Sequence, residues 1–70
     1  MANIQASMAG NLWKVLKGEG DLVEAGEEVA ILESMKMEIP IQSEQAGTIK
    51  AVLKQEGEFV NEGDQLFEIE

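Results

Sequence analysis

The nine residues 15–23, VLKGEGDLV, return as VLKQEGEFV at residues 52–60. This shift of 37 positions aligns residues 1–33 with residues 38–70 without a gap. Twelve of the 33 aligned pairs are identical, whereas ordinary residue frequencies would give about two by chance. Two copies are too few for a solenoid. The duplication therefore predicts one domain, residues 1–70, in which two similar halves share a core around a pseudo-two-fold axis.

Both halves contain β-rich runs that are interrupted by clusters of glycine and acidic residues, as expected for short strands. The aligned glycines predict repeated turn positions where φ is positive. A helix of ordinary length would have to cross these glycines, so an all-β fold is favoured. The predicted strands are 12–17, 22–23, 29–33, 38–42, 49–54, 59–60 and 66–70.

Residues 34–37, Ser-Met-Lys-Met, remain between the two halves. The strands predicted on either side make Met35 and Lys36 the turn of a β-hairpin close to the axis. A two-residue hairpin turn requires positive φ and prefers Asn-Gly or Asp-Gly, so Met-Lys is locally unfavourable. Departures from local preference are expected where a protein functions, which directs attention to this turn.

Composition excludes several classes of function. The 70 residues include five Lys, no Arg, 14 acidic residues, no His and no Cys, for a net charge of −9. Disulfides, Cys- or His-based metal sites and the commonest general base are therefore absent. The acidity argues against nucleic acid and anionic membranes. No run of transmembrane length or signal start is found, so we expect a cytoplasmic protein that is a monomer, with no catalytic or metal-ligating residues of its own.

Lys36 is the central candidate because it lies at the symmetry centre between two methionines. The simplest explanation is a solvated turn lysine. However, two methionines at exposed turn positions are unfavourable for solubility unless they are used. Acylation of such a lysine would remove its charge and convert its flexible stem into a tether.

The hexapeptide at 33–38, Glu-Ser-Met-Lys-Met-Glu, resembles the attachment motif of biotinyl domains. Similarity continues through the small-residue turn at 8–10, the glycine-acidic turn at 20–27, and residues 46–49 and 57–63. The resemblance covers essentially the whole chain. It implies a flattened β-barrel, or barrel-sandwich hybrid, of two four-stranded halves related by a pseudo-two-fold axis, with the modified lysine on a hairpin tip.

The resemblance also implies a function. Lys36 would receive biotin from a biotin protein ligase, and carboxybiotin would shuttle between the active sites of a biotin carboxylase and a carboxyltransferase. The domain itself would be a non-catalytic carrier. Met35 and Met37 would aid recognition by the ligase, and Glu33, Ser34 and Glu38 are further candidates for ligase recognition or, for the two glutamates, for keeping the strand ends soluble.

Ser34 departs from the biotinyl pattern, in which alanine is usual, and is closer to lipoyl domains of the same fold. Lipoyl domains, however, usually place Asp where Met35 stands. A lipoyl carrier for a 2-oxo-acid dehydrogenase, modified by a lipoate-attaching enzyme, or an acceptor of both groups is therefore the alternative. An unmodified adaptor and a helical acyl carrier protein are less consistent with these residues. The resemblance fits either a free-standing attachment protein or a domain of a larger carboxylase.

Two apolar residues have charged counterparts in the other half. Trp13 aligns with Lys50, and Ile31 aligns with Glu68. Trp13 would either lie across the barrel with one ring face buried or belong to a contact patch. Most acidic residues are expected to form a solvated surface that could steer the domain toward basic partners.

Overall fold

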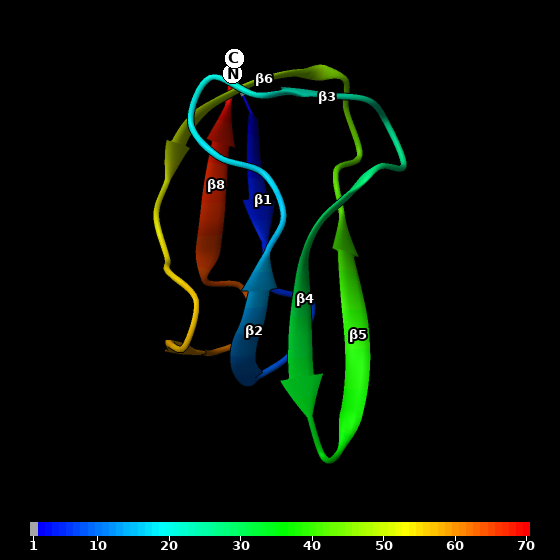
Figure 1. Cartoon of the computed structure of the whole chain (residues 1–70), viewed down its shortest axis with the longest axis vertical. Helices are drawn as coiled ribbons and strands as arrows, with labels where there is room; N and C mark the ends of the chain where they lie inside the picture. The colour runs from blue at the N-terminus through cyan, green and yellow to red at the C-terminus, as the bar shows by residue number, and fades with distance from the viewer. Residues whose placement is uncertain (1) are drawn as a thin grey trace.

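The computed structural model describes residues 2–70, which form eight β-strands and no helix (Figure 1). Met1, where the predicted repeat begins, lies outside the described residues. The all-β prediction is confirmed. The strands are β1 (Ala2–Gln5), β2 (Gly10–Val15), β3 (Leu22–Val23), β4 (Glu28–Ser34), β5 (Met37–Gln42), β6 (Gly47–Val52), β7 (Phe59–Val60) and β8 (Gln65–Ile69).

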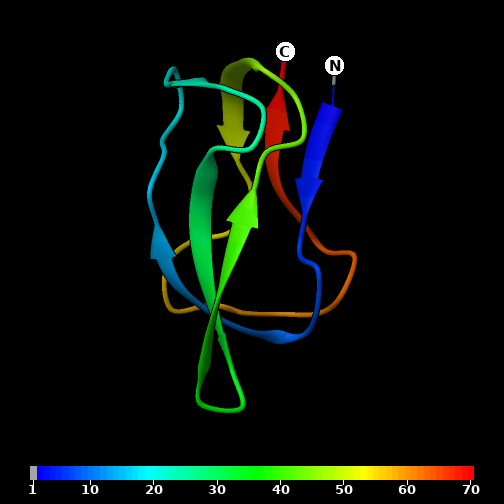
Figure 2. The ribbon, with the colours of Figure 1, turned by 90° about the vertical axis from the view of Figure 1, so that its right-hand side faces the viewer.

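The strands form two antiparallel four-stranded sheets, in the orders β1-β8-β6-β3 and β5-β4-β2-β7. The 37-residue shift converts the first order into the second. Each sheet therefore takes two strands from each half of the chain, so neither half forms a sheet of its own. The β4–β5 hairpin projects at one end of the molecule, and the chain termini lie at the other (Figures 1 and 2).

The inner faces of the two sheets form the hydrophobic core. Leu12 of β2 and its counterpart Ile49 of β6 are both fully buried, as are Leu66 and Phe67 of β8. Each such side chain contributes about 1.5–3 kcal/mol relative to exposure. Within residues 2–70 the buried apolar residues are Ile4, Ala6, Leu12, Val23, Val29, Ala30, Leu32, Ile41, Ile49, Val60, Leu66, Phe67 and Ile69.

The positive φ predicted for the aligned glycines is confirmed at two of the three aligned pairs. Gly20 and its counterpart Gly57 have φ of 90° and 92°, and Gly26 and Gly63 have φ of 84° and 88°. In each of these turns a carboxylate three positions further along the chain accepts a backbone N–H. The donor and acceptor pairs are Gly18 N with Asp21 Oδ2, Glu24 N with Glu27 Oε1, Gln55 N with Glu58 Oε2, and Asn61 N with Asp64 Oδ2. Several acidic residues expected to be merely solvated therefore hold turns.

Two predicted strands are displaced along the chain, whereas the bounds of the others agree within one residue. The strands predicted at 12–17 and 49–54 begin and end two residues earlier, as Gly10–Val15 and Gly47–Val52. Gly10 and Gly47 join the ladders where there is no room for a side chain. A Cβ would lie 2.5 Å from the Glu33 carbonyl oxygen at Gly10, and 2.5 Å from Ile69 Cγ2 and 2.8 Å from the Glu70 carbonyl oxygen at Gly47. The absence of a side chain, which suggested a turn in the sequence, permits this close pairing instead.

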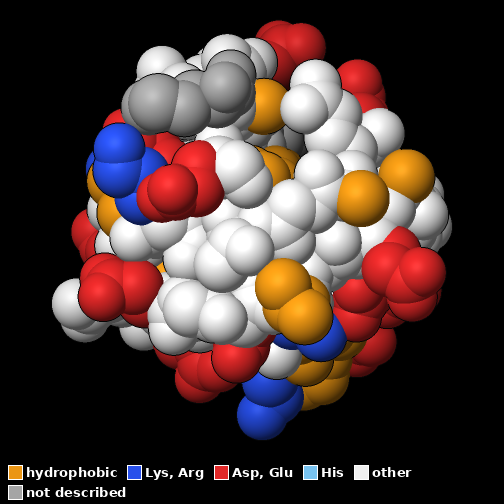
Figure 3. Space-filling model, turned by 90° about the horizontal axis from the view of Figure 1, so that it is seen from above, with side chains coloured by type: hydrophobic (Ala, Val, Ile, Leu, Met, Phe, Trp, Pro, Cys, Tyr) orange, Lys and Arg blue, Asp and Glu red, His pale blue; other side chains and the backbone are white. Residues whose placement is uncertain are grey.

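The surface is predominantly acidic, as the net charge of −9 requires. Viewed from the end that carries the termini, acidic side chains occupy much of the rim, and basic side chains appear in only a few places (Figure 3). No helix among residues 2–70 has the length and apolar character needed to cross a membrane.

Candidate functional site

The β4–β5 hairpin closes through a two-residue turn at Met35 and Lys36, between the paired residues Ser34 and Met37. Met35 has φ of 52° and Lys36 has φ of 65°. Both residues are therefore in the left-handed region, as the turns that match strand twist require. The predicted conflict between turn geometry and residue type is present in the structure.

The hairpin is anchored by its own ladder and by the core. Its pairing runs from Glu28 opposite Gln42 to Ser34 opposite Met37. Buried Leu32 in β4 lies opposite Ile39, which packs against the core. The turn is therefore held on a paired, partly buried ribbon rather than on a loose loop.

The side chains of the turn face solvent. Met35 is 88% exposed, Met37 is 63% exposed, and Lys36 is also exposed. Within residues 2–70 the ion pair found is that of Lys17 with Glu27, so the Lys36 amine is not held by a carboxylate of the described chain. A primary amine at a projecting turn, between two flexible thioethers, is accessible to an enclosing partner.

The other predicted site residues lie on the two strands next to the turn. Glu33 and Glu38 are directly opposite one another, and both are exposed. Like charges in this arrangement are mildly destabilising. Ser34 is half-buried, and its Cβ would lie 3.1 Å from a Cβ placed on Gly10.

Sequence reasoning did not identify the close neighbours of the hairpin. β2 pairs with β4, and β7 pairs with β2, so Asn11 lies between Glu33 and Phe59 in one row of the sheet. Gly10 lets β2 pass close to the hairpin, since a Cβ there would lie 2.5 Å from the Glu33 carbonyl oxygen. The aligned Gly10 and Gly47 are the signal that the sequence offers for this close approach, although residues 8–10 resemble a small-residue turn.

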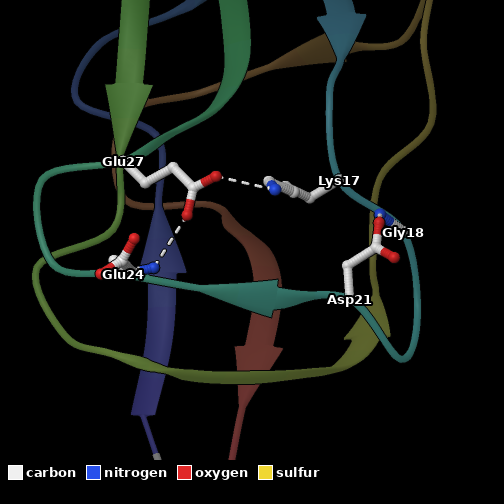
Figure 4. Close-up of polar contacts among 5 residues, drawn as sticks. All are labelled: Lys17, Gly18, Asp21, Glu24 and Glu27. Carbon is white, nitrogen blue, oxygen red and sulfur yellow. Dashed lines mark hydrogen bonds and ion pairs between the residues drawn. The ribbon is translucent and has the colours of Figure 1, made fainter.

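The clearest electrostatic contact lies at the opposite end of the molecule from the turn (Figures 1 and 4). Lys17 Nζ is 2.7 Å from Glu27 Oε2, and Glu27 Oε1 accepts the Glu24 N–H at 2.8 Å. The hydrogen bond from Lys17 and then that from Glu24 lower the pKa of Glu27, and the same bond to Glu27 raises the pKa of Lys17. Residues 2–70 contain no group of three or more candidate metal ligands.

About half of the chain is similar in sequence to two bacterial proteins. Over 38 residues, 54% of this chain, it is 68% identical to the biotin/lipoyl attachment protein of Bacillus subtilis and covers 52% of that protein. Over 35 residues, 50% of this chain, it is 54% identical to the methylmalonyl-CoA carboxyltransferase 1.3S subunit of Propionibacterium freudenreichii and covers 28% of it. The matches thus span about half or less of these relatives.

A solved structure of much greater length contains the same fold. The crystal structure of the Kluyveromyces lactis urea carboxylase matches 97% of this chain at a TM-score of 0.90 and 32% identity, and the match covers 6% of the carboxylase. The family model described as "Biotin-requiring enzyme" matches residues 2–69. The chain therefore belongs to the biotin/lipoyl family, as the motif around Lys36 indicated.

Proposed function

We propose that the chain is a biotin carrier that is covalently loaded at Lys36. The observation that carries this proposal is the position of Lys36 in a left-handed turn at a projecting hairpin end, beside two exposed methionines. Membership of the family described as biotin-requiring and the similarity to a carboxyltransferase subunit support biotin as the group.

Loading is an acylation of the Lys36 Nζ by a biotin protein ligase. An amide forms between Nζ and the carboxyl carbon of biotin, ATP is cleaved to AMP and pyrophosphate, and one carboxylate oxygen leaves with AMP. The amine loses its positive charge in the process. The chain presents the amine, and the ladder of the hairpin keeps it at a defined place relative to the sheet.

Once bound, biotin carries a carboxyl group between a biotin carboxylase and a carboxyltransferase. The contribution of this chain is a stable mount and a high effective concentration of the tethered group at its partners. The sequence has no His and no Cys, so the proposed carrier offers its partners neither an imidazole base nor a thiolate nucleophile.

Met35 and Met37 are proposed to assist recognition by the ligase. Unbranched thioether side chains adapt to more than one partner surface, and both are mostly exposed. Met35→Ala and Met37→Ala should slow biotinylation without lowering the melting temperature. Equal rates for the variants and the parent would remove the methionines from the proposal.

Lipoate is the second candidate, and one observation favours keeping it. The Bacillus subtilis relative, 68% identical over the matched residues, is named for both biotin and lipoyl attachment. Ser34 is also consistent with lipoyl domains. In this case Lys36 would carry an acyl group for a 2-oxo-acid dehydrogenase-type complex.

Intact-mass measurement tests these assignments. The chain would be expressed in cells supplied with biotin, lipoate and both attaching enzymes, with Lys36→Arg as the control. We expect the mass of one biotinyl group on the parent and none on the control. A lipoyl-sized increment would transfer the function to the second candidate. An unmodified parent, or an increment that persists in Lys36→Arg, would overturn attachment at Lys36.

A further inference from the structure

The two sheets have nearly the same fold but different outer faces. On the sheet that carries the hairpin, the outward positions include exposed Trp13, Pro40 and Phe59 and half-buried Ile31. Their counterparts on the other sheet are Lys50, Glu68, Asn3 and Leu22. Three of the four apolar residues are thus replaced by polar or charged ones. The duplication acts as an internal control, because both faces have the same backbone layout.

These four apolar residues, named here the apolar face, lie close together on the strand ladder. Ile31 lies opposite Pro40 in β5 and opposite Lys14 in β2. Trp13 is the extra residue at a register shift in β2, is 44% exposed, and has Lys14 Nζ 5.4 Å from its ring centroid. Trp13 therefore lies on the outer surface with more than half of the residue covered, which agrees with one buried ring face as well as with a contact patch.

Phe59 extends the apolar face toward the hairpin turn. It is 61% exposed and lies opposite Asn11, which in turn lies opposite Glu33. The row of Glu33, Asn11 and Phe59 is next to the pair of Ser34 and Met37, which closes the turn. The two rows are separated by one residue, a step of roughly 3.4 Å along the strand. Any protein surface that encloses Lys36 must approach this end of the sheet.

Exposed aromatic and aliphatic side chains grouped on one face of a small acidic domain are unusual unless they are covered by a partner. Aromatic residues in particular are enriched at the centres of protein interfaces. Next to the apolar face, Glu33 and Glu38 present paired negative charge on the side nearest the turn. The complementary surface is an apolar patch with basic side chains at its border.

We infer that the apolar face docks the enzyme that acylates Lys36, through an apolar surface bordered by basic residues beside that enzyme's active site. This inference rests on the proposed function. It assigns the docking surface to one sheet only, so the enzyme approaches the hairpin from the side of β2 and β7 rather than from the side of β8 and β6.

The chemistry favours this occupant over the alternatives. Before acylation the reacting atom is Lys36 Nζ, one side chain from the backbone, so the acylating enzyme has to contact the adjacent sheet closely. After loading, the reacting group lies at the end of a longer arm, and a carboxylase can reach it without covering this face. A second copy of the chain would bring another charge of −9 to an acidic surface, which opposes self-association.

The test uses equivalent positions on the two sheets. Phe59→Gln and its counterpart Leu22→Gln each remove one exposed apolar side chain, of 61% and 74% exposure. Trp13→Gln and its counterpart Lys50→Gln form a second pair. Initial rates of biotinylation by a bacterial biotin protein ligase would be measured against carrier concentration, and thermal melting would check that every variant is folded.

We expect Phe59→Gln and Trp13→Gln to raise the KM for the carrier about five- to tenfold with little change in kcat. This is the result expected when a variant loses a contact that is equally strong in the bound complex and in the transition state. Leu22→Gln and Lys50→Gln should match the parent. Equal KM values within each folded pair would overturn the inference while leaving biotinylation of the parent intact. A parent that is never biotinylated would instead overturn the proposed function and this inference with it.

The apolar face could instead bind a second copy of the chain, and sedimentation tests this alternative. The parent is expected to remain a monomer over a range of concentrations, as is Phe59→Gln. A dimer of the parent that Phe59→Gln abolishes, together with unchanged ligase kinetics, would assign the apolar face to a second copy and overturn its assignment to the acylating enzyme.

Discussion

Two kinds of turn in this molecule adopt the same unusual backbone conformation. Gly20, Gly26, Gly57 and Gly63 have positive φ, and each can do so without steric cost. Met35 and Lys36 also have positive φ, although each carries a long side chain. The left-handed conformation costs roughly 1–2 kcal/mol for a residue with a Cβ. The glycine turns follow local preference, and the hairpin turn departs from it.

The symmetry of the fold explains where this departure occurs. Each glycine turn has an equivalent 37 residues away, and both copies have the same backbone role. The turn of Met35 and Lys36 lies between the two aligned segments, so it has no aligned copy within residues 2–70. It combines residues that are unfavourable at positive φ with an exposed amine, which is the pattern expected when function selects the side chains.

Replacing the glycines of these turns should have the largest effect on the stability of the fold. The double variant Gly20→Ala, Gly57→Ala places two Cβ atoms at φ near 90° and should destabilise the fold by about 2–4 kcal/mol. Thermal melting should therefore fall by roughly 10 °C or more. The control is Gly18→Ala, which lies outside the left-handed region and has Asp21 Oδ2 at 3.8 Å from its Cβ. Similar melting for the double variant and this control would contradict the argument.

The opposite change at the hairpin turn should stabilise the fold and impair loading. Met35→Asn supplies a residue that tolerates positive φ and should add about 0.5–1 kcal/mol. It should also slow biotinylation, because the exposed thioether is lost. Met8→Asn, at another exposed methionine, serves as the control for the change of side chain. If Met35→Asn melts no higher than the parent, the turn is not strained as described.

Replacing one of the two glutamates that face each other beside the turn should have a smaller effect on stability. Glu38→Gln removes the repulsion with Glu33 across the ladder and should raise the melting temperature by roughly 1–3 °C, less at high salt. Glu28→Gln lies in the same hairpin but faces Gln42, so it should have no comparable effect. An equal rise in both variants would attribute the gain to net charge instead of to the cross-strand pair.

The smallest effect is expected at the end opposite the turn, in the pair of Lys17 and Glu27. The pKa of Glu27 is lowered in the folded state. Its contribution to folding stability is therefore present at pH values above its ordinary pKa of 4.5, and it is lost as the pH falls through the lowered pKa. The raised pKa of Lys17 gives a contribution that is present below 10.5 and is lost above the raised value.

Melting curves of Glu27→Gln and the parent should accordingly differ at pH 7 and converge as the pH falls well below 4.5. The control is Glu44→Gln, for which no hydrogen bond or ion pair is found within residues 2–70. A difference between Glu27→Gln and the parent that is independent of pH would show that packing, and not ionisation, accounts for the contact.

Several features could be predicted because they depend on local or repeated residue patterns. The aligned glycines indicated the positive-φ turns, and strand-like runs on either side of residues 34–37 indicated the hairpin. The mismatch between Met-Lys and the required turn geometry indicated the candidate site. Each of these inferences uses backbone preferences that act within a few residues of the position concerned.

Only the tertiary structure showed how the halves combine. Each sheet takes two strands from each half, so Phe59 reaches the neighbourhood of Glu33 through Asn11. The same pairing gives Gly10 its close approach to the hairpin and makes one outer face apolar. Pairing between strands distant in the chain is selected by packing of the whole core and closure of both sheets, and no local preference encodes it.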